Sequence, residues 1–447
     1  MHSNKGRWIW GCAAALASVV LFPPPVSGQK AGPPSLFHYR LKNGLNVILS
    51  EDFSLPVVSV AVAYDAGSTH EPQGKTGMAA VMENLMFSGS ANVAPRQHFN
   101  YINRVGGTFN ALLMEDRTVF YQTVPSNRLS LVLWLESDRM RFLEIGGRAF
   151  EDARTAILED LRDRRSGDPY FDSARAFDQL LYSDFAQSHS LYGLEGDVRG
   201  LTLDDLRAFY AAHYGPNNGV LCITGNFDRF KAQELISQYF ETLPRGGDAA
   251  PAAEPLALAR KQVIKSFVAG SYLSPAFHLG FRLTAPRSAD FYTLTILDYI
   301  LLRGRSSRIT RRLLNPEDKI AVQLSGGIEK RRDRSVYKIF VQANTDDMAD
   351  RCQSALFTEL DRLKSSPLSE DVLGRYKAMF KQDFLGRMST SVERALFLTD
   401  FFLSLGDFRE FGLELDKYLS VTPADIVGIV ARYFSPENSI VLNVRGK

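Results

Sequence analysis

The chain has 447 residues, which is too long for one ordinary hydrophobic core and predicts two or three domains. Its 45% hydrophobic and 23% charged residues are typical of an ordered globular protein and exclude an intrinsically disordered one. The formal net charge of +2 argues against nucleic acid or an anionic membrane surface as the main partner.

Residues 1–28 have the pattern of a cleavable secretory signal. A short basic head precedes an apolar run from Trp8 to Phe22, and small residues lead to Gly28. A retained membrane anchor is the alternative. A membrane span needs about 20 apolar residues and this run is shorter, so we favour cleavage. We then expect residues 29–35 to be a leader and the mature protein to be exported to the periplasm or outside the cell. No membrane span is expected after cleavage.

Two cysteines lie outside this signal, Cys222 and Cys352. Export permits a disulfide, but two cysteines do not form a disulfide framework, and the sequence leaves their pairing open. Cys222 lies in an apolar run at 220–223, which predicts a small buried side chain.

Strands and helices alternate along the first half. Apolar or alternating runs predict strands, and longer periodic runs predict helices. The expected strands are 45–49, 57–64, 119–124 and 220–224, and the expected helices are 77–87, 129–142 and 149–164. Strands in one sheet with helices packed mainly on one face predict an α+β architecture.

A segment at 244–255, PRGGDAAPAAEP, contains almost nothing that a core could bury. Its Pro, Gly and Ala content predicts a linker. The linker would separate an N-terminal domain at 36–243 from a C-terminal domain at 256–447.

The two halves end alike, which indicates an internal repeat. At an offset of 220, five positions near the end of the first half recur in the second. They are Thr202, Asp205, Tyr214, Pro216 and Asn218, matched by Thr422, Asp425, Phe434, Pro436 and Asn438. We therefore expect two homologous domains in which a helix, a Pro-Asn turn and a strand occur in the same order.

Residues 77–87, GMAAVMENLMF, resemble the motif helix of the pitrilysin/insulinase/mitochondrial-processing-peptidase family. In that family an H-x-x-E-H pattern places two zinc-binding histidines on one helical face, with the Glu as general base toward the bound water. Glu83 occupies the general-base position. The two histidine positions are Ala80 and Asn84, so both metal ligands on this helix are missing.

The resemblance extends over most of residues 36–226. Residues 67–71 resemble the family's G-S-x-x-E turn, residues 106–111 its G-G-x-x-N-A strand, and residues 214–218 its Y-x-P-N-N turn. The second half matches more loosely, chiefly at 307–309 and in the C-terminal repeat. The chain is identified as a member of this family with a degenerate zinc motif.

The family's third zinc ligand is a Glu on a later helix. The matching position here is Asp160, and Glu159 lies one residue out of register, about 100° around the helix. The histidines are scattered without the i, i+3 or i, i+4 spacing of a ligand pair. We expect no cofactor, although active family members hold zinc. We then expect Glu83 to be a structural relic rather than a working base. If buried, its carboxylate must be neutralised or hydrogen-bonded, and Asn84 or an arginine such as Arg117 could serve.

Gly106, Gly107, Asn110 and Ala111 match the strand that accepts extended peptides at a sheet edge in this family. Backbone groups make those contacts, so peptide binding does not require the metal. The alternative is that the glycines mark a turn and the Asn-Ala pair continues an ordinary strand. The sequence does not decide between the two.

The resemblance implies closed chambers built from four such domains, so a two-domain chain needs a second chain. We expect a non-catalytic subunit that binds extended peptides beside a zinc-bearing homologous peptidase subunit, or one that self-associates. The alternative is an active zinc metalloendopeptidase with a variant metal site. A third reading is an independent exported scaffold without a peptidase partner.

Overall fold

The computed structural model describes residues 36–247, 257–269, 273–315, 317, 319–409 and 411–446. The predicted signal at 1–28, the leader at 29–35 and most of the predicted linker at 244–255 lie outside the described residues. Within them, no helix is both long enough and apolar enough to cross a membrane.

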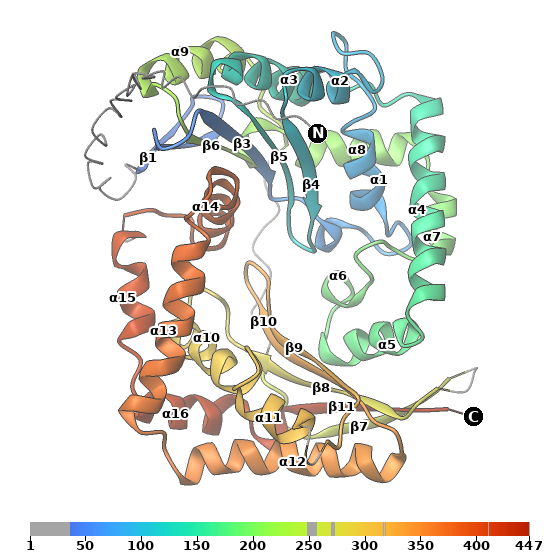
Figure 1. The fold of residues 1–447 in the computed structure, drawn as a ribbon. Helices are drawn as coiled ribbons and strands as arrows, with labels where there is room; N and C mark the ends of the chain where they lie inside the picture. The colour runs from blue at the N-terminus through green and yellow to red at the C-terminus, as the bar shows by residue number, and fades with distance from the viewer. Residues whose placement is uncertain are drawn as a thin grey trace, which may run out of the picture. The chain divides into compact units, whose positions relative to one another are not determined.

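Two β-sheets contain the strands of the described residues (Figure 1). The first has the order β1-β2-β6-β3-β5-β4 and the second β7-β11-β8-β10-β9. The strands are β1 Leu36–Arg40, β2 Asn46–Glu51, β3 Val57–Tyr64, β4 Thr108–Leu113, β5 Thr118–Pro125, β6 Gly219–Gly225, β7 Val263–Val268, β8 Ala276–Leu283, β9 Gln323–Lys330, β10 Ser335–Gln342 and β11 Ser439–Arg445.

The helices of the first half begin after the third strand, as the periodicity predicts. They are α1 Met78–Leu85, α2 Gln97–Arg104, α3 Leu129–Phe142, α4 Gly147–Gly167, α5 Phe171–Leu181, α6 Phe185–Ser188, α7 Glu195–Gly200, α8 Leu203–His213 and α9 Arg229–Phe240. The second half contains α10 Asp290–Leu301, α11 Arg308–Leu314, α12 Asp346–Ser365, α13 Glu370–Gly386, α14 Ser391–Leu405, α15 Glu414–Leu419 and α16 Pro423–Tyr433.

The sequence repeat is also a structural repeat. Strand pairs β2–β6 and β7–β11 are parallel. Beyond β6 the first sheet continues antiparallel with β3, β5 and β4, and beyond β11 the second continues antiparallel with β8, β10 and β9. The first sheet has β1 as an additional strand beside β2. Thr202 and Thr422 each cap a helix by accepting a backbone N–H three residues on. The amides of Asn218 and Asn438 donate to the carbonyl five residues earlier, at 2.8 and 2.7 Å. The α+β architecture of two homologous units is confirmed.

One face of the first sheet carries the core of the first half. Side chains of β2 and β3 pack there against α1, α3, α4, α8 and α9. The opposite face is also apolar, and a helix from the second half covers it. Ala395 and Leu398 of α14 are fully buried against Ile48, Ala61 and Cys222. Cys222 is thus a buried apolar residue, as expected, and it and Cys352 are free thiols.

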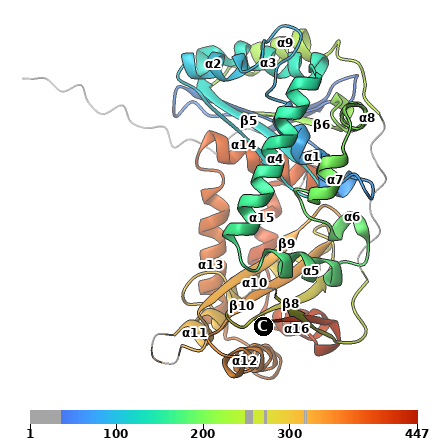
Figure 2. The same ribbon diagram turned by 90° about the vertical axis from the view of Figure 1, so that its right-hand side faces the viewer.

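The second sheet receives a helix from the first half in return. Phe177 and Leu181 of α5 are buried against Ile440 on β11. They press on β8 at Gly280, where an added Cβ would lie 2.7 Å from the Phe177 ring, so only glycine fits. Helices α5 and α14 begin at Phe171 and Ser391, again 220 residues apart. Each half therefore covers the other's sheet with an equivalent helix (Figure 2).

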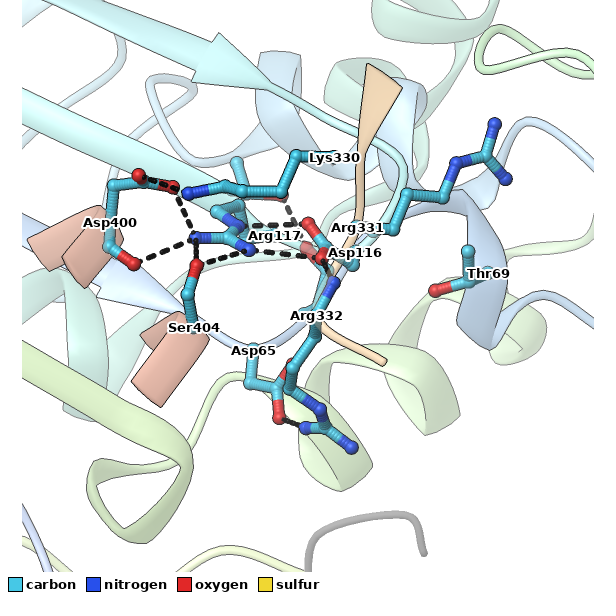
Figure 3. Close-up of polar contacts among 12 residues, drawn as sticks. Asp65, Thr69, Asp116, Arg117, Lys330, Arg331, Arg332, Asp400 and Ser404 are labelled. Carbon is cyan, nitrogen blue, oxygen red and sulfur yellow. Dashed lines mark hydrogen bonds and ion pairs between the residues drawn. The ribbon is translucent and has the colours of Figure 1, made fainter. Parts of the chain in front are cut away.

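Ion pairs at two equivalent hairpin ends hold this exchange in place. Arg117, in the turn of the β4–β5 hairpin, binds Asp400 on α14 at 2.7 Å. Arg334, in the turn of the β9–β10 hairpin, pairs with Asp184, the N-cap residue of α6. Figure 3 shows Arg117 between Asp400 and Asp116, whose carboxylate also accepts the Arg332 backbone N–H at 2.5 Å. Residues from both halves thus share one charged cluster.

The electrostatics of this cluster favour its ionised form. Burial tends to raise the pKa of Asp116, but the adjacent Arg117 guanidinium outweighs it and the pKa falls below its usual value. The Arg117 side chain is only 3% exposed, so its charge depends on these carboxylates rather than on water.

Replacing Arg117 by Met should destabilise the protein by about 3–5 kcal/mol, because two carboxylates would lose their buried counter-charge. Urea denaturation followed by circular dichroism measures the change. The control is Arg165→Met, which removes an ion pair to Asp172 whose arginine is 62% exposed and should leave the midpoint almost unchanged. Equal midpoints for the two variants would contradict a structural role for the cluster.

Candidate functional site

Helix α1 is held at its N-terminus by a buried carboxylate. Glu71 Oε2 accepts the Gly77 N–H and Oε1 accepts the Ala79 N–H, both at 2.8 Å. These are donors that the first turn of a helix leaves unpaired. Gly77 has φ 93°, and an added Cβ would lie 2.5 Å from Val198, so glycine is required there. The turn and the motif helix therefore form one rigid unit.

The first two ligand positions of the family lie one helical turn apart on α1, as expected from their spacing. Ala80 is fully buried and offers no donor atom. The Asn84 side chain is exposed, and its amide nitrogen donates to the Ala80 carbonyl at 3.2 Å. This bond lies within the helix, so the face where two imidazoles would stand presents a methyl group and an amide.

The third position, Asp160 on α4, is engaged by an arginine. Arg164 Nε donates to Asp160 Oδ2 at 2.7 Å, and its Nη2 donates to the Tyr192 hydroxyl at 2.9 Å. The Arg164 guanidinium also lies 3.9 Å from the centre of the Tyr192 ring. The carboxylate at the ligand position thus has a cationic partner of its own.

Glu83 faces this pair from the half-buried side of α1. Burial raises the pKa of Glu83, and the negative charge of Asp160 raises it further. Glu159 is exposed, and Asp160 is the acidic residue of α4 that acts on Glu83. Arg117, which we considered as a counter-charge for Glu83, instead binds Asp116 and Asp400. The structure therefore brings Glu83 and Asp160 together without the imidazoles that zinc requires.

These residues do not fit a catalytic zinc ion. Such a site takes three protein ligands, usually His with His, Glu or Cys, and keeps one open position. Here the three positions hold a methyl group, an exposed amide and an arginine-paired carboxylate. Among the described residues, no group of three or more His, Cys, Asp or Glu side chains is placed to hold a metal.

A cleft of about 510 Å³ opens beside this position. It is lined by Glu83 and Asn84 of α1 and by residues 107–111, which include most of the predicted peptide-binding positions. Phe99 is 50% exposed, and its ring lies 4.3 Å from that of Phe109, centre to centre. The cleft thus combines an aromatic wall with one strand of the first sheet.

Strand β4 forms an edge of that sheet, because β5 is its single neighbour among the described strands. Gly106 has φ 75° and turns the chain from α2 into the strand. Gly107 approaches its neighbours closely, since an added Cβ would lie 2.7 Å from Val124. Asn110 Oδ1 accepts the Ala111 N–H at 2.9 Å. The glycines are therefore required by the backbone, and the exposed strand follows them.

The histidines have structural partners. His189 Nε2 bonds Glu71 Oε2 at 3.1 Å, so it supports the cap of α1. His98 is 5% exposed beside the cleft and bonds Gln122 at 3.2 Å. Neither role could be read from the sequence, and nor could the capping role of Glu71. The G-S-x-x-E turn at 67–71, whose Glu71 lies six residues before Gly77, is the signal that the sequence offers for the cap.

The fold defines a peptidase-like protein of two homologous halves. Family models support this assignment. The model described as Insulinase (Peptidase family M16) matches residues 46–190, and the one described as Peptidase M16 inactive domain matches residues 200–380. The chain belongs to peptidase family M16.

Individual relatives agree with this assignment. The chain is 24% identical over 411 residues to a protein named zinc protease PqqE from Helicobacter pylori, covering 89% of this chain and 90% of the relative. It is 23% identical over 288 residues to a probable mitochondrial-processing peptidase subunit beta from Schizosaccharomyces pombe, covering 61% of each. A crystal structure of a protease from Helicobacter pylori superposes with a TM-score of 0.86 at 23% identity, covering 92% of this chain and 100% of that one.

His98 should make the protein less stable in acid. Burial, with the nearby Arg139 charge, lowers the pKa of His98 to about 3. The unfolded chain binds a proton near pH 6.5, so stability contributed by neutral His98 is present above that pH and is lost as the pH falls from 6.5 toward 3. The loss approaches about 1.4 kcal/mol per pH unit within that window.

We expect His98→Gln to flatten the pH dependence of the unfolding free energy between pH 6.5 and pH 4, measured by urea denaturation at several pH values. The exposed His38→Gln variant serves as the control. An unchanged slope in His98→Gln would show that other groups dominate acid denaturation.

Proposed function

We propose that the chain is an exported, non-catalytic M16 subunit that binds extended peptides beside a zinc-bearing homologue. One observation carries the proposal. The positions that would hold zinc present Ala80, Asn84 and an Asp160 paired to Arg164, while the adjacent strand and cleft remain open. Loss of metal chemistry with retention of the binding surface favours a role in capture rather than cleavage.

Peptide capture would use the edge of β4. An extended peptide can add to an exposed strand through backbone hydrogen bonds, with alternate side chains entering neighbouring pockets. The rings of Phe99 and Phe109 offer an apolar surface for such side chains. Gly106, Gly107, Asn110 and Ala111 are then the peptide-binding positions that we propose.

A partner subunit would complete the chamber that the family resemblance implies. The Schizosaccharomyces pombe relative is named as a subunit, which supports an assembly of unlike chains. The partner would carry the H-x-x-E-H helix and cleave peptides that this chain helps to hold. Self-association is the other arrangement. Measuring the molecular mass of the assembly with and without the homologue distinguishes a complex of unlike chains from a self-associated one.

Export and domain limits belong to the same proposal. The signal-like pattern of residues 1–28 supports export, with residues 29–35 as the leader. We propose peptidase-like domains at 36–243 and 256–447, joined by the linker at 244–255. The two sheets, which lie on either side of that linker in sequence, support this division.

The purified mature chain should contain less than about a tenth of an equivalent of zinc and should show no chelator-sensitive cleavage of an unfolded-peptide pool. The matched variant A80H/N84H/D160E restores the family's ligand set and should gain zinc. Metal analysis and a peptide cleavage assay measure both. Stoichiometric zinc with chelator-sensitive cleavage in the unmodified chain would favour the active metallopeptidase instead.

Replacing Phe99 by Ser should weaken binding of an extended apolar peptide by roughly tenfold, since a buried Phe contact contributes about 1.5–3 kcal/mol. Fluorescence anisotropy with a labelled peptide measures the affinity. Phe230→Ser is the control, because Phe230 is 65% exposed and lies on α9, outside the cleft lining. Equal affinities for the two variants would place peptide binding elsewhere.

A further inference from the structure

A larger cleft, of about 1030 Å³, lies in the second half between α11, α12 and the start of α13. The two views agree in placing α11 beside α12 (Figures 1 and 2). Of the described residues that line it, one is acidic, Glu359, and five are arginines: Arg305, Arg308, Arg311, Arg312 and Arg362. The lining carries four net positive charges, although the whole chain carries a formal charge of only +2.

Glu359 fixes two of these arginines. It is 6% exposed and accepts a hydrogen bond from Arg308 Nε at 3.1 Å and from Arg362 Nη1 at 2.7 Å. A buried carboxylate that orients two guanidinium groups gives the cleft a preorganised donor surface. The side chains of Arg305 and Arg311 have no ion pair or hydrogen bond with any other described residue. Their guanidinium groups are available to a ligand, and an anion would relieve the repulsion among the five like charges.

The same cleft has an apolar wall formed by Leu314, Leu368, Val372 and Tyr376. A small inorganic anion would contact only the arginines and leave this wall in water. At about 30 Å³ per water molecule, the volume holds roughly 30 waters, which is room for several amino-acid side chains. Charge, size and apolar lining together fit a chain molecule that bears both carboxylates and apolar groups.

We propose that this cleft binds an acidic polypeptide segment in which carboxylates alternate with apolar side chains. The carboxylates would bind Arg305 and Arg311, and the apolar side chains would pack on Val372 and its neighbours. The site is separate from the edge of β4, and its occupation requires no metal and no second subunit. It therefore stands or fails independently of the function proposed above.

The test uses the full mature chain alone and a short fluorescein-labelled peptide of alternating Glu and Leu, followed by anisotropy. We expect binding that weakens with added salt, and no binding of the same peptide with Gln in place of Glu. The variant R305Q/R311Q should lose affinity by at least about tenfold, since it removes two charge-assisted contacts. The control R128Q/R162Q removes the same charge from exposed arginines outside the cleft and should bind like the unmodified chain.

Two further measurements separate this ligand from its rivals. Val372→Ser should weaken peptide binding without changing the binding of inorganic triphosphate, because only the peptide contacts the apolar wall. Phe99→Ser should leave the acidic peptide bound as tightly as before, which distinguishes this cleft from the one at β4. Triphosphate binding without peptide binding would overturn the proposal, as would peptide affinity that R305Q/R311Q leaves unchanged.

Discussion

Each sheet of this protein has two apolar faces but only one set of helices from its own half. Leaving the second face exposed to water would be unfavourable, because burying a Leu or Phe side chain stabilises the folded state by about 1.5–3 kcal/mol. The exchange of α5 and α14 satisfies this constraint. The ion pairs Arg117–Asp400 and Arg334–Asp184 then fix the register of the exchange.

The motif helix shows that local backbone geometry and metal chemistry are independent. Glu71 caps α1, and Gly77 permits its close approach to Val198, whether or not imidazoles follow. The helix therefore keeps its place while Ala80 and Asn84 occupy the ligand positions. Arg164 then supplies Asp160 with the positive charge that a metal ion would otherwise provide.

Much of the fold follows from sequence, because periodicity and turn chemistry are local. The strand at 57–64 and the helix at 129–142 were predicted with the limits observed, and the offset of 220 predicted the repeated helix–turn–strand unit. The lack of histidine at positions 80 and 84 is equally visible in the sequence. The partners of Arg117 and His189 were not, because Asp400 lies 283 residues away and Glu71 118 residues away. The grouping of five arginines around one cleft could not be predicted for the same reason, since Arg362 lies 50 residues beyond Arg312 in the sequence.

The exchanged helices also bear on how such a chain can be divided. A first half expressed alone would expose Ile48, Ala61 and Cys222, and its own α5 would have no sheet to cover. Two copies of a single half could satisfy both surfaces by trading that helix about a twofold axis. The present chain has the geometry of such a symmetric dimer with its subunits joined end to end. In a fused pair only one copy needs to keep a given set of chemical groups, which leaves the two halves free to diverge.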